Sequence, residues 1–134
     1  MNGILAVETI KARFVQSSPT VEISLQKGGT FTAALQPDGI AVNNLGNQPF
    51  LPWLVFQEAV CVLIRMNGRA QRGNAMTSRL GDADLSFDSI EGHIAQVVYG
   101  KKAGETVFRR ITPISAILIW AGICDGVPGE LLLK

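Results

Sequence analysis

The stretch that decides the fold class is residues 21–35, which read VEISLQKGGTFTAAL. Apolar and polar residues alternate over 21–26 and again over 31–35, which is the period of a strand with one buried face. Between these two runs lies Gly28-Gly29, and both glycines tolerate the positive φ that a two-residue hairpin turn requires. The stretch therefore predicts an antiparallel β-hairpin.

The residues around this hairpin extend the prediction in both directions. Pro37-Asp38-Gly39 has the composition of a second turn, and Ile40 to Leu45 follows it as a third strand. These segments together predict a three-stranded antiparallel meander. Residues 4–15 mix apolar and polar positions and are compatible with a short helix or an edge strand, which Ser17-Ser18-Pro19 ends.

A helix is predicted after the meander. Leu51-Pro52 precedes apolar residues at helical spacing, and proline is favoured at the first helical position because its missing N–H has no partner there. This helix should run to about Met66, with Asn67-Gly68 as its stop. Residues 67–81 are predicted to form a loop rich in Gly, Asn and Arg, with a short helix from Asn74 to Leu80.

The C-terminal third predicts two further helices. Asp88 and Glu91 have the spacing of a capping box, which would open a helix ending near Gly100. A hairpin of residues 93–99 and 105–111 is the alternative, because its valines also favour strands. Thr112-Pro113 then starts a helix over 113–124 that is apolar nearly all round. Asp125-Gly126 turns the chain, and Leu131 to Leu133 can return as an edge strand.

Together these segments predict a single α+β domain over residues 1–134. We expect the N-terminal three-stranded antiparallel meander to pack against two or three C-terminal helices, with helix 113–124 central and buried. The chain has 134 residues, 47% of them hydrophobic and 17% charged, and a formal net charge of +1. This balance excludes an intrinsically disordered chain, and a near-neutral chain gives no general reason to bind nucleic acid or membranes.

Compartment is inferred from the same residues. Glu8 interrupts the apolar N-terminal run before it reaches the length of a secretory signal, and the longest apolar stretch, Ile114 to Cys124, is too short to cross a bilayer. Cys61 and Cys124 lie in apolar stretches, so we expect both thiols to be reduced and buried. The sequence therefore predicts a cytoplasmic protein without membrane association.

One candidate for chemistry is the acidic group around the only histidine: Asp82, Asp84, Asp88, Glu91 and His93. A calcium loop starting at Asp82 fails at its required glycine and glutamate, and the spacing of the cysteines and histidine does not fit zinc. No metal is therefore expected. General acid–base work by His93 with Glu91 or Asp88 remains open, as in a small hydrolase, and the alternative is helix capping and surface solvation.

A second candidate is an arginine-rich loop over residues 65–79, in which no acidic residue lies between Glu58 and Asp82. Its arginines can bind phosphate bidentately: Arg65, Arg69, Arg72 and Arg79. Lys101, Lys102, Arg109 and Arg110 form a second basic group. The loop contains no aromatic residue, so stacking on bases is not expected. The alternative is that the loop is solvated or paired with Asp82 and Asp84. No nucleotide-binding motif is present, and no cofactor is expected.

Helix 113–124 also predicts self-association. A helix that is apolar all round must be covered on every side, and a chain this short has few elements to cover it. A homodimer is the commonest solution, with Trp120 or Phe108 as an anchor. The alternative is that residues 1–15 fold over the helix as a lid.

Several segments between residues 40 and 134 resemble small uncharacterised bacterial proteins of the kind encoded on mobile gene cassettes. They are Trp53-x-x-Phe56, Asn67-Gly68-Arg69-Ala70-x-Arg72-Gly73-Asn74-Ala75, Arg79-Leu80-Gly81-Asp82 and Ile111-Thr112-Pro113-Ile114. The resemblance implies no activity or ligand. The sequence leaves three functions open: a non-enzymatic homo-oligomeric binding module, a small hydrolase using the acidic group, and an anion or nucleic-acid binder using the arginine-rich loop.

Overall fold

The structure is a computed structural model that describes all residues from 1 to 134, and its architecture is α+β, as predicted. Four α-helices are present: α1 (Gly3–Ser17), α2 (Trp53–Arg65), α3 (Ile90–Val97) and α4 (Ile111–Trp120), together with one 3₁₀ turn, η1 (Ala83–Leu85). The first antiparallel sheet holds β1 (Thr20–Ser24), β2 (Thr30–Gln36), β3 (Gly39–Val42) and β4 (Phe50–Pro52) in that order. The second holds β5 (Arg69–Gln71), β7 (Glu130–Leu133) and β6 (Cys124–Val127).

The chain starts with a helix, so the prediction of an N-terminal meander is wrong for the first element. The Asn2 side chain caps α1 by accepting a hydrogen bond of 2.9 Å from the Leu5 N–H. Ala6, Ile10 and Phe14 lie on the buried stripe of the helix, which packs beside α2. This apolar stripe explains why residues 4–15 adopt the helical alternative and not the edge strand.

The predicted meander is confirmed, and it continues into a fourth strand. Strand β1 pairs antiparallel with β2, β2 with β3, and β3 with β4, whose residues Phe50–Pro52 carry no strand signal of their own. Pairing between β1 and β2 ends at Ser24 and Thr30, so the turn is five residues long and not two. The Leu25 N–H donates to the Gly29 carbonyl at 2.9 Å and closes this longer turn.

Helix α2 forms close to its predicted limits. It ends before Asn67 and Gly68, which both have positive φ (62° and 90°), and the Gly68 N–H donates to the Leu63 carbonyl at 2.7 Å. Pro52 stands one position before the first helical residue, as the N-cap. The predicted start and stop are therefore correct to within one residue.

Within residues 67–110 the predicted helix after Asp88 forms, as α3, but other details differ. No helix forms over 74–80, and Asn74 Oδ1 instead accepts hydrogen bonds from the Met76 and Thr77 N–H groups in a turn. The alternative hairpin is absent, because α3 occupies most of residues 93–99 and residues 105–111 form no strand. The capping box is wrong by one residue: Ser89 Oγ, not Asp88, accepts the hydrogen bond at the start of α3, from the Gly92 N–H at 3.1 Å.

The C-terminal elements are shifted from their predicted bounds. Helix α4 begins at Ile111 and ends at Trp120, because Gly122 with φ 77° breaks it and the chain enters β6 at Cys124. Strand β7 was expected at an edge, but it lies between β5 and β6. The residues of β5 were expected in a loop and those of β6 in a helix and turn, so neither neighbour of β7 was foreseen.

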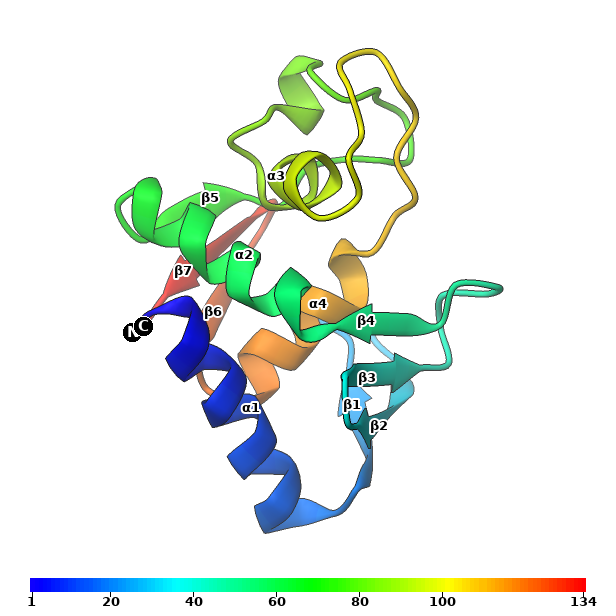
Figure 1. Ribbon diagram of the computed structural model, residues 1–134, viewed down its shortest axis with the longest axis vertical. Coiled ribbons are helices and arrows are strands. Elements are labelled where there is room, and N and C mark those ends of the chain that lie inside the picture. The colour runs from blue at the N-terminus through cyan, green and yellow to red at the C-terminus, as the bar shows by residue number, and fades with distance from the viewer.

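Helix α4 is central, as predicted, and lies between the two sheets (Figure 1). Its residues from Ile114 to Leu118 are buried, while Ile119 and Trp120 are half-buried. Trp120 packs edge-on against Phe14 of α1, with ring centroids 4.9 Å apart. The chain itself thus covers most of the helix and leaves Ile119 and Trp120 half-exposed, so the dimer stays a prediction. None of the four helices combines the length and the apolar character that a membrane-spanning segment requires.

The two cysteines differ in their environment. Cys124 is buried as expected, and burial raises the pKa of its thiol to about 12. Cys61 is exposed on α2, so the expectation that both thiols are buried is wrong for this one. The pKa of Cys61 is also raised, first by partial desolvation and then by the nearby Glu58 charge. Neither thiol is activated as a nucleophile.

Candidate functional site: a cavity between two hairpins

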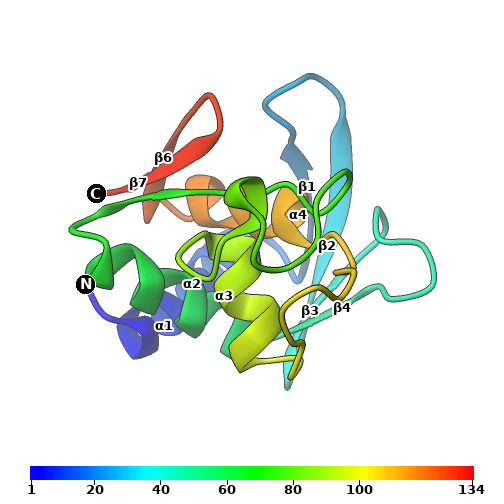
Figure 2. The same cartoon turned by 90° about the horizontal axis from the view of Figure 1, so that it is seen from above.

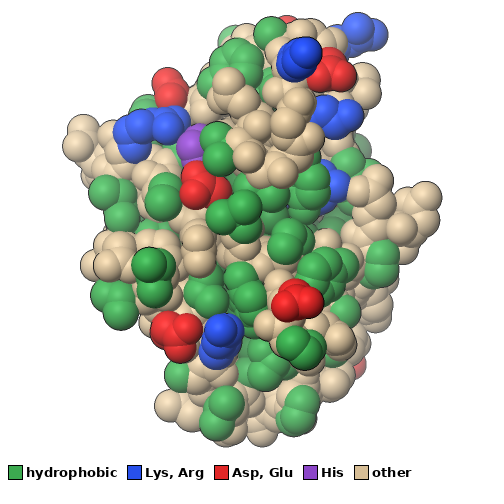
Figure 3. Space-filling view, viewed as in Figure 1, with side chains coloured by type: hydrophobic (Ala, Val, Ile, Leu, Met, Phe, Trp, Pro, Cys, Tyr) green, Lys and Arg blue, Asp and Glu red, His purple; other side chains and the backbone are tan.

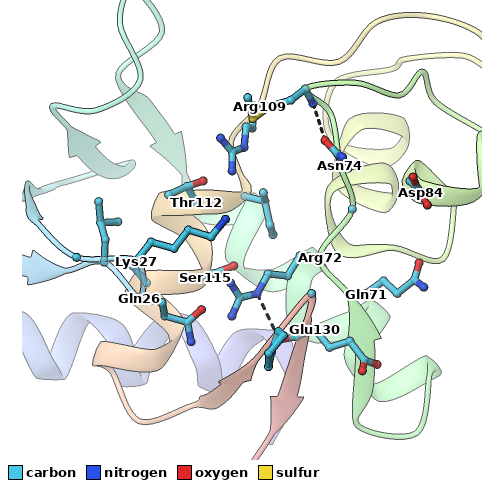
Figure 4. Close-up of a pocket in the computed structure, with 18 residues that line it drawn as sticks. Gln26, Lys27, Gln71, Arg72, Asn74, Asp84, Arg109, Thr112, Ser115 and Glu130 are labelled. Carbon is cyan, nitrogen blue, oxygen red and sulfur yellow. Dashed lines mark hydrogen bonds between the residues drawn. The ribbon is translucent and has the colours of Figure 1, made fainter.

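A cavity of about 840 Å³ lies above α4, between the turns of two hairpins. The β1–β2 and β6–β7 hairpins project from the same side of the molecule, one on each side of α4 (Figure 2). The wall opposite α4 is the segment that leaves β5, with residues 71–74. The polar residues that line the cavity, labelled in Figure 4, are Gln26, Lys27, Gln71, Arg72, Asn74, Asp84, Arg109, Thr112, Ser115 and Glu130.

Arg72 is held in place by hydrogen bonds on three sides. Its backbone N–H donates to the Gly129 carbonyl and its carbonyl accepts from the Glu91 N–H, both at 2.9 Å. Its Nε donates to the Glu130 carbonyl at 3.3 Å. These contacts fix the backbone and the base of the guanidinium, whose Nη2 is fully buried and faces Gly126 of β6. Figure 4 shows the guanidinium beside Ser115.

Two buried polar atoms in this cavity have no hydrogen-bond partner, Arg72 Nη2 and Ser115 Oγ. Ser115 is only 3% exposed and comes from the second turn of α4. A buried donor without a partner costs about 1–3 kcal/mol, and more if it is charged. Burial also lowers the pKa of Arg72, because the charged form is poorly solvated. Both atoms are closed off from solvent, so an anion would remove these penalties once the wall of the cavity had opened to admit it.

The side chains that line the cavity carry more positive than negative charge. Lys27 and Arg109 line it together with Arg72, and none of the three forms an ion pair within the protein. Of its two carboxylates, Glu130 accepts two hydrogen bonds from Arg69, at 2.8 and 3.0 Å, while Asp84 forms no ion pair. Positive charge therefore exceeds negative charge in the lining.

Glu91 connects two walls of the cavity, although it does not line it. Its backbone N–H donates to the Arg72 carbonyl, and its carboxylate accepts a hydrogen bond of 2.5 Å from the Arg110 N–H, where α4 begins. Glu91 is 1% exposed, and burial raises its pKa to about 7 against the opposing effect of the Arg110 and Ile111 amides. This carboxylate acts as a helix cap, which explains why α4 starts before Thr112.

The acidic group does not converge on the histidine. His93 is 6% exposed, visible as a small area in Figure 3, and its Nε2 donates to Glu58 of α2 at 2.8 Å. Asp82 accepts the Arg79 N–H in a turn, and Asp88 pairs with Arg65 at 2.9 Å. Asp84 lines the cavity and Glu91 caps α4. The five residues therefore serve separate contacts, and no general acid–base pair is formed among them.

The four arginines of the predicted anion-binding loop are also divided. Only Arg72 lines the cavity. Arg65 is paired with Asp88 and Arg69 with Glu130, while Arg79 forms no ion pair and lies outside the cavity lining. A continuous basic surface, as nucleic-acid binding would require, is therefore not formed by these side chains.

The second basic group and the predicted interface residues are placed as follows. Arg109 lines the cavity, whereas Arg110 is buried over the Tyr99 ring at 3.7 Å and donates to Gln48 at 2.6 Å. Lys101 and Lys102 lie outside the cavity lining. Phe108 is half-buried beside Arg110, at 4.8 Å, and Trp120 packs on Phe14.

Several residues of the cavity were missed from the sequence. Lys27 lies in a turn predicted only for its glycines, and Thr112 was interpreted only as a helix start. Glu58, the partner of His93, gave no signal because it comes from a different helix. The density of Gly, Asn and Arg over 67–81 was the one useful indication, since it marks irregular backbone where function concentrates.

No group of three or more His, Cys, Asp or Glu side chains is arranged to hold a metal ion. Comparison with known proteins gives no match to a family model, a curated protein or a solved structure.

Proposed function

We propose that this protein is a binding protein for a small anionic ligand, which it holds in the cavity between the β1–β2 and β6–β7 turns. The observation that supports the proposal best is the pair of buried, unpartnered groups, Arg72 Nη2 and Ser115 Oγ, in the same cavity lining. A volume of about 840 Å³ is in the range of small-molecule sites.

Binding is favoured over catalysis by the surroundings of Ser115. Its hydroxyl has no hydrogen-bond partner, so no base activates it as a nucleophile. The only histidine, His93, is hydrogen-bonded to Glu58, and neither residue lines the cavity. The proposal therefore keeps the binding-module hypothesis and joins it to the anion hypothesis, with Arg72 as the one residue of the arginine-rich loop that the ligand contacts.

Isothermal titration with inorganic phosphate at low ionic strength tests the proposal. Arg72→Met should weaken binding at least about tenfold, since a hydrogen bond to a charged group contributes about 1.5–3 kcal/mol. Arg79→Met is the matched control, because Arg79 lies in the same loop but not in the cavity, and it should change affinity less than about twofold.

Ser115→Ala is the second variant, and it guards against a folding defect in Arg72→Met. Removal of a buried hydroxyl without a partner should leave the unfolding midpoint unchanged or raise it, while phosphate binding weakens. Equal phosphate binding by the parent, Arg72→Met and Ser115→Ala would contradict the proposed function.

A further inference from the structure

We infer that the ligand of this cavity is a phosphate monoester of a polyhydroxylated molecule, that is, a sugar phosphate or a compound of the same kind. The inference rests on the proposed anion-binding function and adds the class of ligand to it. It is argued from the distribution of polar groups along the cavity, with cationic side chains at one end and neutral or acidic side chains at the other.

One end of the cavity is built for an anion of more than one charge. Figure 4 shows Lys27 and Arg109 extending toward the same part of the cavity as Arg72, around Thr112 and Ser115 of α4. A phosphate monoester carries a charge of about −1.5 to −2 at neutral pH and has three strong acceptor oxygens. Three cations and a hydroxyl match that charge and that number of acceptors better than they match one carboxylate.

The other end is neutral or acidic and suits hydroxyl groups. Gln71, Asn74 and Asp84 lie on the opposite side of the cavity from Lys27 (Figure 4). Their amide and carboxylate groups can donate to and accept from the hydroxyls of a ligand, and Asp84 would repel a second anionic group. A bare phosphate ion held at Arg72 would leave this end without contacts.

The composition of the lining disfavours two other classes of phosphate ester. No aromatic side chain lines the cavity, so a nucleobase would find no ring on which to stack. Apolar side chains are few in the lining, which is made mostly of polar side chains and the backbone of three glycines. An acyl chain would therefore lie against polar groups. Hydroxyl-rich ligands remain as the class that the whole lining fits.

Calorimetric titration of the intact protein with five probes tests this inference: inorganic phosphate, glucose 6-phosphate, ribose 5-phosphate, glucose and AMP. At least one sugar phosphate should bind at least about tenfold tighter than inorganic phosphate, glucose and AMP, because both ends of the cavity are used. Equal affinity for inorganic phosphate and the sugar phosphates, or a preference for AMP, would overturn the inference and leave anion binding intact. Failure of every anionic probe to bind would instead overturn the proposed function.

Variants at the neutral end test whether this end binds the hydroxyl groups of the ligand and not its phosphate. The double variant Gln71→Ala/Asp84→Ala should reduce the affinity for the best sugar phosphate about tenfold. It should not weaken the binding of inorganic phosphate, because the loss of the Asp84 charge favours an anion. Gln16→Ala is the control, since Gln16 is an exposed amide at the end of α1 and outside the cavity. An unchanged affinity for the sugar phosphate in the double variant would overturn the assignment of this end.

Discussion

Replacing Glu91 by glutamine should change how the stability of the protein depends on pH. Glu91 is buried, and its pKa in the folded protein is raised from 4.5 to about 7, mainly by desolvation. One pKa unit corresponds to about 1.4 kcal/mol, so the folded state should lose about 3 kcal/mol of stability from this group as the pH rises. The glutamine side chain of the variant cannot titrate, and it retains an oxygen that can accept from the Arg110 N–H.

The sign of the effect follows from the direction of the shift. Because the folded pKa lies above the unfolded one, the folded state binds more protons between about pH 4.5 and pH 7. The contribution of Glu91 is therefore fully present below pH 4.5 and is lost as the pH rises through 7. Relative to Glu91→Gln, the parent protein should be more stable at the acidic end of this window than at the neutral end.

Urea denaturation at a series of pH values, followed by the fluorescence of Trp53 and Trp120, measures this difference. Glu22→Gln removes an exposed carboxyl and shows what the loss of one surface charge does by itself. A difference between parent and Glu91→Gln that does not change with pH would refute the reasoning. A difference of opposite sign would mean that the amide hydrogen bonds to Glu91 outweigh its desolvation.

Three further predictions concern the fold and its assembly. Ser89→Ala should destabilise the protein by about 1 kcal/mol, because it removes a helix cap. Asp88→Ala should cost only about a few tenths of a kcal/mol, because it breaks an exposed ion pair. The reverse order in urea denaturation would show that Asp88, and not Ser89, caps α3. Gly39→Ala should lower the thermal midpoint and cost on the order of 1–3 kcal/mol, since its Cβ would overlap the Leu51 carbonyl oxygen, and an unchanged midpoint would contradict this packing. The protein should self-associate in sedimentation equilibrium through the half-buried end of α4 at Ile119 and Trp120, and a single species of 14.4 kDa at every concentration would contradict this.

The parts of the fold that were predictable depend on local signals. The alternation over 21–35 and the stop at Asn67-Gly68 are properties of the chain within a few residues, and both are confirmed. Strand β5 is only three residues long, and its middle residue Ala70 is buried in the main hydrophobic core, which distant elements complete. Such a strand has no pattern of its own, so the second sheet could not be predicted from local sequence.

The site was less predictable for a related reason. Arg72 and Arg79 lie in the same irregular segment, yet only Arg72 lines the cavity, because Gly129 and Glu91 bind its backbone from distant elements. Ser115 was one of several serines without a distinguishing motif, and its importance comes from burial without a partner. Sequence could identify the residue types that bind anions, whereas tertiary contacts select which of them do so.

The two turns that flank the cavity belong to separate sheets, and this has a consequence for dynamics. No backbone hydrogen bond joins the β1–β2 hairpin to the β6–β7 hairpin, and the Gln26 side chain occupies the space that a Cβ on Gly126 of β6 would take. Each turn can therefore open without disturbing the ladder of the other sheet, on the nanosecond to microsecond timescale of loops. A ligand that contacts Lys27 and Arg72 would link these independent motions, so amide hydrogen exchange should slow together in both hairpins when it binds.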